Sequence, residues 1–571
     1  MTKDISQLNR IPRPIDWYGV TCLIMGVGVF ALLFPLTCLD PHSVFWHFDH
    51  DRLGQALGWF FWVNEPWGFP LGNIESMIYP VGITVSYTDS IPLLALITKP
   101  LAELIGFPTQ FFGIWLLVCF CLQGFFAYKL LTSLGLSGLV SLIGSLFFSF
   151  SPVLLARFQH TSLCAHWLIL LGLWLYFRDT AKEIYRPLVW IFLQVIACLI
   201  ALYLVPFTLV IAIASFFGAG KPWYKLPKQL LFLLTSIFFV LWVFGYLGNQ
   251  ILMIQGFGEY SADLLTMINP RLVSIYQNLT ASRFIDGWVP GEGQYEGFGY
   301  LGVGVLLLIG IFCIRRTWFS QNIRILIPII VGASLLAIYS LSSQVTLAGT
   351  KVLDLGWFYK YLGTICHTFR ASGRFIWLLY YLLMALGVAW SVKNLKLSWQ
   401  IILLSIALFL QLYDISSLIQ DDYRYRQTLY KPPTSSAFEG LGLDYDTIAL
   451  YPPQVNAECP PGRIYGAEDI LLNSITGLWL AAREKMNINS GTAARVFLNE
   501  EKSACNLFLA KIAQGEIDHR TVYIPESGYQ DELESLTAGK LLCGRIERET
   551  FCISRNHNTR LLRYLRDISS S

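Results

Sequence analysis

The chain has 571 residues, of which 54% are hydrophobic, 15% aromatic and only 14% charged. Soluble globular domains carry roughly 25% charged residues, so this composition excludes an ordinary soluble protein. The formal net charge is +3, and no basic patch with interleaved aromatic residues is found, which argues against nucleic acid as a partner. The composition therefore indicates an integral membrane protein whose partners include membrane lipid.

The charged residues are unevenly distributed along the chain. Long apolar runs follow one another up to Tyr413, whereas after Tyr423 the charged residues are interspersed as in a water-soluble domain. We therefore predict a membrane domain at 1–415 and a soluble domain at 416–571, which is long enough for one fold. The predicted fold class is mainly α: a polytopic transmembrane bundle, then a small α/β or α+β extracytoplasmic domain.

A helix needs about 20 apolar residues to cross a bilayer. The first apolar run follows Lys3, Arg10 and Arg13, is too long for a signal-peptide core and lacks a small-residue cleavage site, so it is predicted to stay as a helix. The eleven predicted spans are 18–39, 109–131, 137–156, 161–177, 187–203, 204–219, 227–247, 298–314, 325–343, 373–392 and 398–415.

Two apolar stretches are ambiguous, and the positive-inside rule resolves both. The stretch 91–107 is short and broken by two prolines, so it is predicted to be re-entrant or interfacial. The stretch 187–219 would be about 50 Å long as one helix, so it is divided near Pro206 into two spans. This assignment places the N-terminus and the short basic loops in the cytoplasm. The long acidic loops and the C-terminal domain are then outside.

The first outer loop, 40–108, carries the candidate catalytic residues. Asp40 lies at the mouth of the first span, and Asp49 and Asp51 follow it. Clustered carboxylates at a membrane boundary can supply a general base, and Asp49 and Asp51 are also candidate ligands for a divalent cation, Mg²⁺ or Mn²⁺. The alternative is that they are solvated loop charges that cap a helix. The aromatic segment 53–62 is predicted to lie in the membrane interface.

Polar residues recur where later segments enter the membrane. Asp89 directly precedes the stretch 91–107 and is a candidate for substrate binding. Arg157 and His160 lie in a short second outer loop, where they are candidates for binding a donor phosphate. His166 lies one to two turns inside the next span. An intramembrane ionisable residue is a functional candidate by default, although a neutral histidine often only hydrogen-bonds a neighbouring helix.

The third and fourth outer loops supply further candidates. Glu292, Glu296 and Tyr300 lie at the rim of the span that follows them and are candidates for substrate binding. Arg370 and Arg374 are four residues apart, so at a helix start they would share one face. Such a pair suits a phosphate or pyrophosphate clamp. The alternatives are that they extend to lipid headgroups or pair with loop carboxylates.

The soluble domain contains short apolar runs, DTIALYPP and TVYIPES, that predict strands, and the run ILLNSITGLWLAAREKM predicts a helix. It also holds four cysteines, which in an oxidising compartment could form two disulfides. Cys543 and Cys552 flank GRIERET, a predicted hairpin, so we expect these two to pair. The alternative is reduced thiols packed as small hydrophobic side chains.

Five blocks of the sequence, GWFFW…EPWGFPLG, YTDSIPLLAL, YEGFGYLG, TFRASGRFIW and MNINSGTAAR, resemble a bacterial family of GT-C-like membrane proteins. The layout, with a long acidic first outer loop and outer arginines, is similar to that of the GT-C superfamily. These are polytopic glycosyltransferases that use lipid-phosphate-linked sugars. They commonly carry a DD, DE or ED pair in the first loop, whereas this chain has the spaced Asp49-His50-Asp51.

The resemblance implies a glycosyltransferase in the bacterial cytoplasmic membrane. It would move a sugar from a polyprenyl-phosphate donor to a glycan, lipid or protein acceptor on the outer face. The arginine pair would hold the donor phosphate, and one of the three first-loop aspartates would deprotonate the acceptor hydroxyl or bind a cation. One alternative is a transporter or flippase for a lipid-linked glycan, although the spans are nearly free of charge and show no internal repeat. The other is a non-catalytic polysaccharide-assembly protein.

Overall fold

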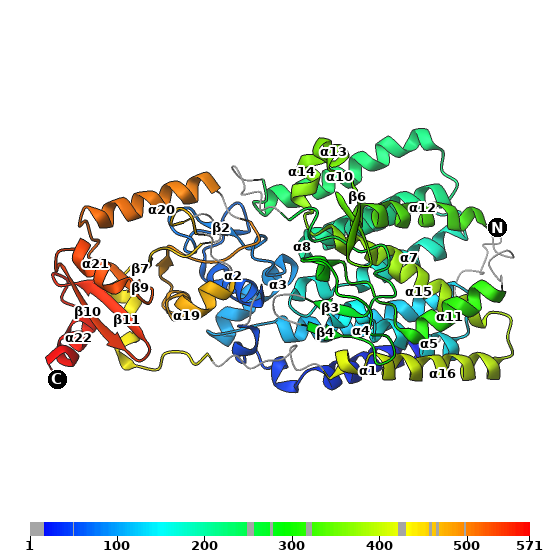
Figure 1. The fold of residues 1–571 in the computed structure, drawn as a ribbon, viewed down its shortest axis with the longest axis horizontal. Coiled ribbons are helices and arrows are strands. Elements are labelled where there is room, and N and C mark those ends of the chain that lie inside the picture. The colour runs from blue at the N-terminus through cyan, green and yellow to red at the C-terminus, as the bar shows by residue number, and fades with distance from the viewer. Residues whose placement is uncertain are drawn as a thin grey trace, which may run out of the picture.

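The computed structural model describes residues 16–48, 51–247, 256–273, 278–315, 323–420, 430–455, 459–463, 467–495 and 498–570. Figure 1 shows a helical domain, at the right of the view, and a smaller domain that contains a β-sheet, at the left. The C-terminus lies at the outer end of the smaller domain.

The larger domain is mainly helical, as predicted. Its main helices are α1 (Trp17–Leu33), α4 (Phe112–Ser133), α5 (Gly138–Ser149), α6 (Pro152–Leu155), α7 (Trp167–Thr180), α8 (Pro187–Ile200), α9 (Val205–Gly218), α10 (Leu226–Val243), α11 (Val303–Arg315), α12 (Ile323–Ser340), α15 (Trp377–Val392) and α16 (Leu397–Asp414). Six helical segments of the described chain are long and apolar enough to cross a membrane, and they contain α4, α5 with α6, α7, α10, α15 and α16. Five shorter apolar helices coincide with the remaining predicted spans: Trp17–Leu33, Pro187–Ile200, Leu202–Gly218, Val303–Arg315 and Arg324–Ser340.

Helix α15 lies at the centre of the helical domain, because 89% of its apolar segment is buried, compared with 11% for α10. Around α15 pack α11, α12 and α16. Helix α10 exposes large apolar side chains, among them Leu231, Phe238 and Trp242. A large apolar surface on a helix of this composition is expected to face lipid rather than water.

The first outer loop forms the helices α2 (Asp51–Asn64) and α3 (Pro92–Ile105) and a small antiparallel pair, β1 (Asn73–Ile74) with β2 (Ile83–Thr84). The aromatic segment 53–62, for which a position in the membrane interface is predicted, does not present its aromatic side chains to lipid. The segment is helical, but Trp59, Phe60 and Trp62 are fully buried. They are covered because α2 and α3 lie between α8 and α19 (Ala467–Arg483) of the smaller domain (Figure 1).

The smaller domain is built on a five-stranded mixed sheet in the order β10-β11-β9-β7-β8. The predicted strands DTIALYPP and TVYIPES correspond to β7 and β9, and the predicted helix corresponds to α19. The sheet consists of β7 (Thr447–Tyr451), β8 (Asn487–Ile488), β9 (Thr521–Pro525), β10 (Leu541–Ile546) and β11 (Glu549–Ser554), and its other helices are α18 (Leu441–Asp444), α20 (Leu498–Ala513), α21 (Gln530–Leu536) and α22 (Arg560–Ser570). Strand β7 is parallel to β8 and β9, whereas β11 is antiparallel to β9 and β10.

The remaining short elements lie between the helices of the larger domain or at its end. They are β3 (Arg271–Val273), β4 (Asn278–Thr280), β5 (Gln344–Leu347), β6 (Thr350–Asp354), α13 (Gly356–Tyr359), α14 (Gly363–Thr368) and α17 (Ser416–Ile419). The strands β3 and β4 form one antiparallel hairpin, and β5 and β6 form another.

The smaller domain, which we call the sheet domain, is attached to the first outer loop by main-chain hydrogen bonds. The Ile488 N–H of β8 donates to the Ser76 carbonyl at 2.8 Å, and the Tyr79 N–H donates to the Ile488 carbonyl at 2.8 Å. Further along, the Ala494 N–H donates to the Tyr87 carbonyl at 2.6 Å. Because main-chain bonds set a register, they hold the sheet domain in one position over the loop.

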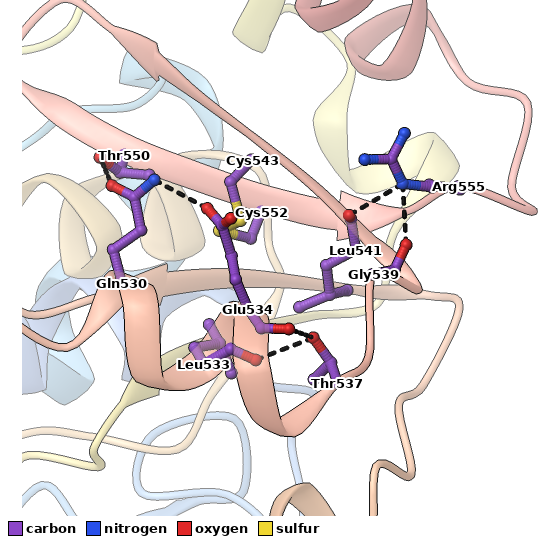
Figure 2. The surroundings of a disulfide bond; sticks show 10 residues. All are labelled: Gln530, Leu533, Glu534, Thr537, Gly539, Leu541, Cys543, Thr550, Cys552 and Arg555. Carbon is purple, nitrogen blue, oxygen red and sulfur yellow. Dashed lines mark hydrogen bonds between the residues drawn. A yellow bond between two sulfur atoms is a disulfide. The ribbon is translucent and has the colours of Figure 1, made fainter.

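Figure 2 shows the predicted pair Cys543 and Cys552, which lie opposite each other on β10 and β11 and form a disulfide. Gln530 of the neighbouring helix α21 accepts a hydrogen bond from the Thr550 hydroxyl at 3.2 Å, which joins this helix to the hairpin. A second disulfide joins Cys459 to Cys505. Both disulfides belong to the sheet domain.

The number of thiols that react with a maleimide under denaturing conditions tests these assignments. The chain has 12 cysteines, and eight of them are free thiols in the structure. In protein purified without reductant, we expect eight labels by mass spectrometry before reduction and 12 after it. Twelve labels before reduction would contradict both disulfides, and ten would leave only one of them.

Candidate functional site

A buried carboxylate, Glu296, is paired with two arginines from distant parts of the chain. It lies in a short 3-10 turn (Gln294–Gly297) before α11. The Nε and Nη2 atoms of Arg374 donate to its two oxygens at 2.9 and 2.5 Å, and Arg157 Nη1 donates at 2.5 Å. The three side chains are at most 9% exposed. Such forked, charge-assisted hydrogen bonds are among the strongest in proteins.

Two glycines bring this carboxylate and Arg374 together. Gly297 follows Glu296, and Gly373 precedes Arg374 in a second 3-10 turn (Ser372–Ile376). A Cβ added to Gly373 would lie 2.6 Å from the Gly297 backbone, a separation that no side chain tolerates. The Gly373 N–H also donates to the Tyr260 carbonyl at 2.8 Å. The two turns can therefore touch only because Gly373 has no side chain, and the missing side chain of Gly297 allows its turn to pack on the Ser261–Ala262 backbone.

Aromatic rings lie against both guanidinium groups. The Cζ atom of Arg374 is 4.4 Å from the ring centroid of Tyr203, and the Cζ atom of Arg157 is 5.4 Å from that of Trp377. Arg157 also donates to the Tyr295 carbonyl at 2.7 Å. The two ring contacts are cation–π interactions, which stabilise an arginine that is removed from water. The sequence offered no sign of them, because aromatic residues within apolar spans are indistinguishable from core residues.

The two arginines keep Glu296 ionised. Burial alone would raise the pKa of its carboxyl group, but the positive charges of Arg374 and Arg157 outweigh burial and lower the pKa well below the usual range. A depressed folded-state pKa contributes stability above the unfolded-state pKa, and this contribution is lost only as the pH falls through the folded-state value. The ion cluster therefore persists throughout the neutral range.

His160 connects this cluster to the surface. Its Nε2 atom lies 3.7 Å from Glu296 Oε1, 3.4 Å from Arg374 Nη2 and 3.5 Å from Asp51 Oδ2. The side chain of Asp51 is 51% exposed, that of His160 18% and that of Glu296 5%. Asp51 begins α2, where the helix dipole favours a negative charge. The structure thus brings together Asp51, Arg157, His160, Glu296 and Arg374 of the predicted candidates.

Asp89 lies beside this group on a strained loop. Its φ is 55°, and that of the β-branched residue Ile91 is 51°, a conformation that is rare for such residues. The loop is held on α2, because the Ser90 hydroxyl donates to the Gln55 carbonyl at 2.7 Å. Strained backbone of this kind persists where the surroundings hold it, and it is frequent at functional sites.

Burial raises the pKa of the Asp89 carboxyl group, and the charges of His160 and Arg374 only partly oppose this. The negative charge of Asp51 raises the same pKa further. Asp89 and Asp51 therefore act on each other electrostatically, and the side chain of Asp51 is the one exposed to solvent.

Arg370 does not share a helix face with Arg374, contrary to the prediction. It lies in coil before the 3-10 turn that carries Arg374, so the helical spacing that was assumed does not apply. The Cζ atom of Arg370 is 5.6 Å from the ring centroid of Tyr260. Burial raises the pKa of Tyr260, which also senses the charges of Arg370, Glu296 and Asp51, so Arg370 still acts on the same site.

Other predicted candidates have different surroundings. Asp40 is exposed and accepts a hydrogen bond from the His42 N–H at 2.9 Å, which matches the alternative of a solvated loop charge. The Tyr300 hydroxyl donates to buried Asp414 at 2.8 Å, so this tyrosine stabilises the bundle. Glu292 is exposed. The predicted candidate Asp49 lies outside the described residues.

His166 is completely buried inside the helical domain. Its Nδ1 atom lies 2.7 Å from the Tyr381 hydroxyl, and its ring lies 4.4 Å from that of Trp377 between centroids. This is the arrangement of a neutral histidine that hydrogen-bonds a neighbouring helix, the alternative that the sequence left open.

In the part of the chain that the structure describes, no three His, Cys, Asp or Glu side chains converge as metal ligands. Asp49, the second predicted ligand beside Asp51, is not among the described residues. A divalent-cation site at Asp49 and Asp51 therefore stays a prediction.

The described residues form a mainly helical protein with six candidate membrane-spanning helices and a C-terminal domain that contains a β-sheet. The family model described as "Domain of unknown function (DUF6311)" matches residues 23–416, and the one described as "DUF6311 C-terminal domain" matches residues 437–554. Because the first match covers more than half of the chain, the protein belongs to this family. No curated protein matches the chain.

Replacing Glu296 with Gln should destabilise the protein. The variant removes the charge that compensates two buried guanidinium groups, and breaking such a cluster costs about 3–5 kcal/mol. We expect a clearly lower midpoint of thermal unfolding in detergent. The matched control is Glu292→Gln, in the same loop but exposed, which should unfold at the wild-type temperature. Equal midpoints for the two variants would refute the structural role of Glu296.

Replacing Asp89 with Asn should make stability less dependent on pH. Because the folded-state pKa of Asp89 is raised, its contribution is fully present below the unfolded-state pKa of about 4 and is lost as the pH rises through the folded-state value. Asn tolerates the same backbone conformation. We expect the variant to gain thermal stability relative to the wild type between pH 4 and pH 8. A difference that does not change over this range would disprove the raised pKa.

Proposed function

We propose that this protein is a membrane glycosyltransferase that moves a sugar from a polyprenyl-phosphate donor to an envelope acceptor on the outer face of the bacterial cytoplasmic membrane. The observation that carries the proposal is the line from exposed Asp51 through His160 to the buried Glu296–Arg374 pair. It combines an accessible carboxylate with a fixed positive environment. Those two features are what the transfer of a sugar from a phosphate requires.

The proposal includes the full predicted topology. If the five shorter apolar helices cross the membrane together with the six longer segments, the odd number of spans places the sheet domain opposite the cytoplasmic N-terminus. The basic short loops support this orientation through the positive-inside rule. The two disulfides of the sheet domain support it independently, because disulfides persist in oxidising compartments.

In the proposed reaction, the phosphate of the donor binds beside Arg370 and Arg374. Arg157 and Arg374 share one buried carboxylate, that of Glu296. This cluster therefore carries one positive charge more than it carries negative charges, and it can attract an anion. Because this charge is fixed before the reaction, it stabilises the phosphate as it becomes a leaving group. The exposed end of the site, at Asp51, is then left for the acceptor.

Asp51 accepts the proton of the acceptor hydroxyl. The hydroxyl oxygen forms a bond to the anomeric carbon of the sugar, while the bond from that carbon to the phosphate oxygen breaks. The polyprenyl phosphate leaves with the electron pair, and the configuration at the anomeric carbon is inverted. Asp89, held on its strained loop next to His160, binds a sugar hydroxyl.

Replacing Asp51 with Asn should remove the general base with little change in shape. General-base catalysis contributes about 10²–10⁴-fold, so we expect the transfer of radiolabelled sugar from a polyprenyl-phosphate sugar to membrane glycan to fall at least about a hundredfold. Asp49→Asn is measured in parallel. The control is Asp286→Asn, at an exposed outer-loop aspartate, which should keep wild-type transfer.

Full transfer by both the Asp49 and the Asp51 variants would exclude these residues as the base. A wild-type protein that binds the donor but forms no product would instead identify a non-catalytic assembly protein.

A further inference from the structure

One segment of the sheet domain, 491–495, extends into the loops around the site. A Cβ added to Gly54 of α2 would lie 3.3 Å from the Thr492 side chain, so the segment lies directly on α2. The main-chain bond from Ala494 to Tyr87 fixes the segment two residues before Asp89. The next residue of the segment, Arg495, therefore lies near Asp89 of the first outer loop.

Arg495 makes contact with the membrane domain at a second point. Its Nη2 atom donates to the carbonyl oxygen of Thr368, the last residue of α14 and two residues before Arg370. Its charge also acts on Asp89 and Tyr87, as shown by its lowering effect on the pKa of each group. Arg495 is only partly buried. A guanidinium group has five N–H donors, so one bond to a carbonyl leaves others for a ligand.

Guanidinium groups of both domains lie near Asp89. The charges of Arg374, from the membrane domain, and of Arg495, from the sheet domain, both lower the pKa of its carboxyl group, whereas Asp51 raises it. Arginine is well suited to binding a phosphate group, because its planar guanidinium can donate two parallel hydrogen bonds.

We propose that Arg495 completes an anion site between the two domains and that the ligand is the phosphate group of a polyprenyl phosphate. This inference rests on the proposed function and adds that the sheet domain is part of the donor site. A planar guanidinium binds two phosphate oxygens at once, which a lysine ammonium cannot do. The sheet domain then contributes a donor-binding residue that also joins it to Thr368.

The test measures the binding of undecaprenyl phosphate and of undecaprenol to the full chain in detergent. A charge-assisted hydrogen bond contributes about 1.5–3 kcal/mol, so Arg495→Gln should weaken binding of the phosphate at least about tenfold and leave undecaprenol binding unchanged. The affinity of Arg495→Lys for the phosphate should lie between that of the wild type and that of Arg495→Gln. Inorganic phosphate should compete with the lipid phosphate less well in Arg495→Gln than in the wild type. The control is Arg520→Gln, in the same domain, whose arginine pairs with exposed Asp446 and which should bind as the wild type does.

The outcomes separate this inference from the proposed function. Unchanged phosphate binding by Arg495→Gln, with binding lost on replacing Arg374, would overturn the inference and leave the proposed function standing. Equal loss of both lipids would show that Arg495 only joins the domains, which also overturns the inference. If the wild type binds neither lipid, both proposals fail. If phosphate binding depends on Arg495 but no variant or wild-type protein transfers sugar, the anion site stands and the proposed function fails.

Discussion

The rest of the site depends on the buried ion cluster formed by Glu296, Arg157 and Arg374. Removing charges from water is costly, so the cluster is stable only when all three groups are present with their hydrogen bonds made. Its members come from the loop after α6, the turn before α11 and the turn before α15. The cluster therefore locks three helix junctions together, and it sets the position of His160 above it.

The second organising feature is the burial of the first outer loop. This loop is enclosed between the helical domain and the sheet domain, and Trp479 of α19 lies against Phe60 of α2, with 5.8 Å between ring centroids. The aromatic side chains that indicate a membrane-interface helix in the sequence instead form the contact between the two domains. Asp51 at the start of α2 and Asp89 shortly before α3 are thereby close enough to act on each other electrostatically.

Several residues that the sequence names as candidates for the site have other surroundings in the structure. Spacing of four residues indicates a common face only on a continuous helix, and the 3-10 turn before α15 breaks that assumption for Arg370 and Arg374. Tyr300 and His166 are buried in the bundle, where Tyr300 hydrogen-bonds Asp414 and His166 hydrogen-bonds Tyr381. Their polarity in the sequence reflects the need to pair buried polar groups. Arg495 gave no signal in the sequence, because it is one of many charged residues in a soluble region.

Sequence patterns were sufficient to predict the division into an apolar helical region and a more polar C-terminal region, the positions of the main helices and the strands β7 and β9. These follow from composition and periodicity, which are local properties of the chain. It also indicated that Asp51, His160, Glu296 and Arg374 are unusual for where they lie. Which of these residues meet depends on how the chain folds in three dimensions. Arg157 and Glu296 are 139 residues apart, and Arg495 and Thr368 are 127 apart. Contacts at such separations depend on how helices and domains pack, and one sequence carries no pattern that records them.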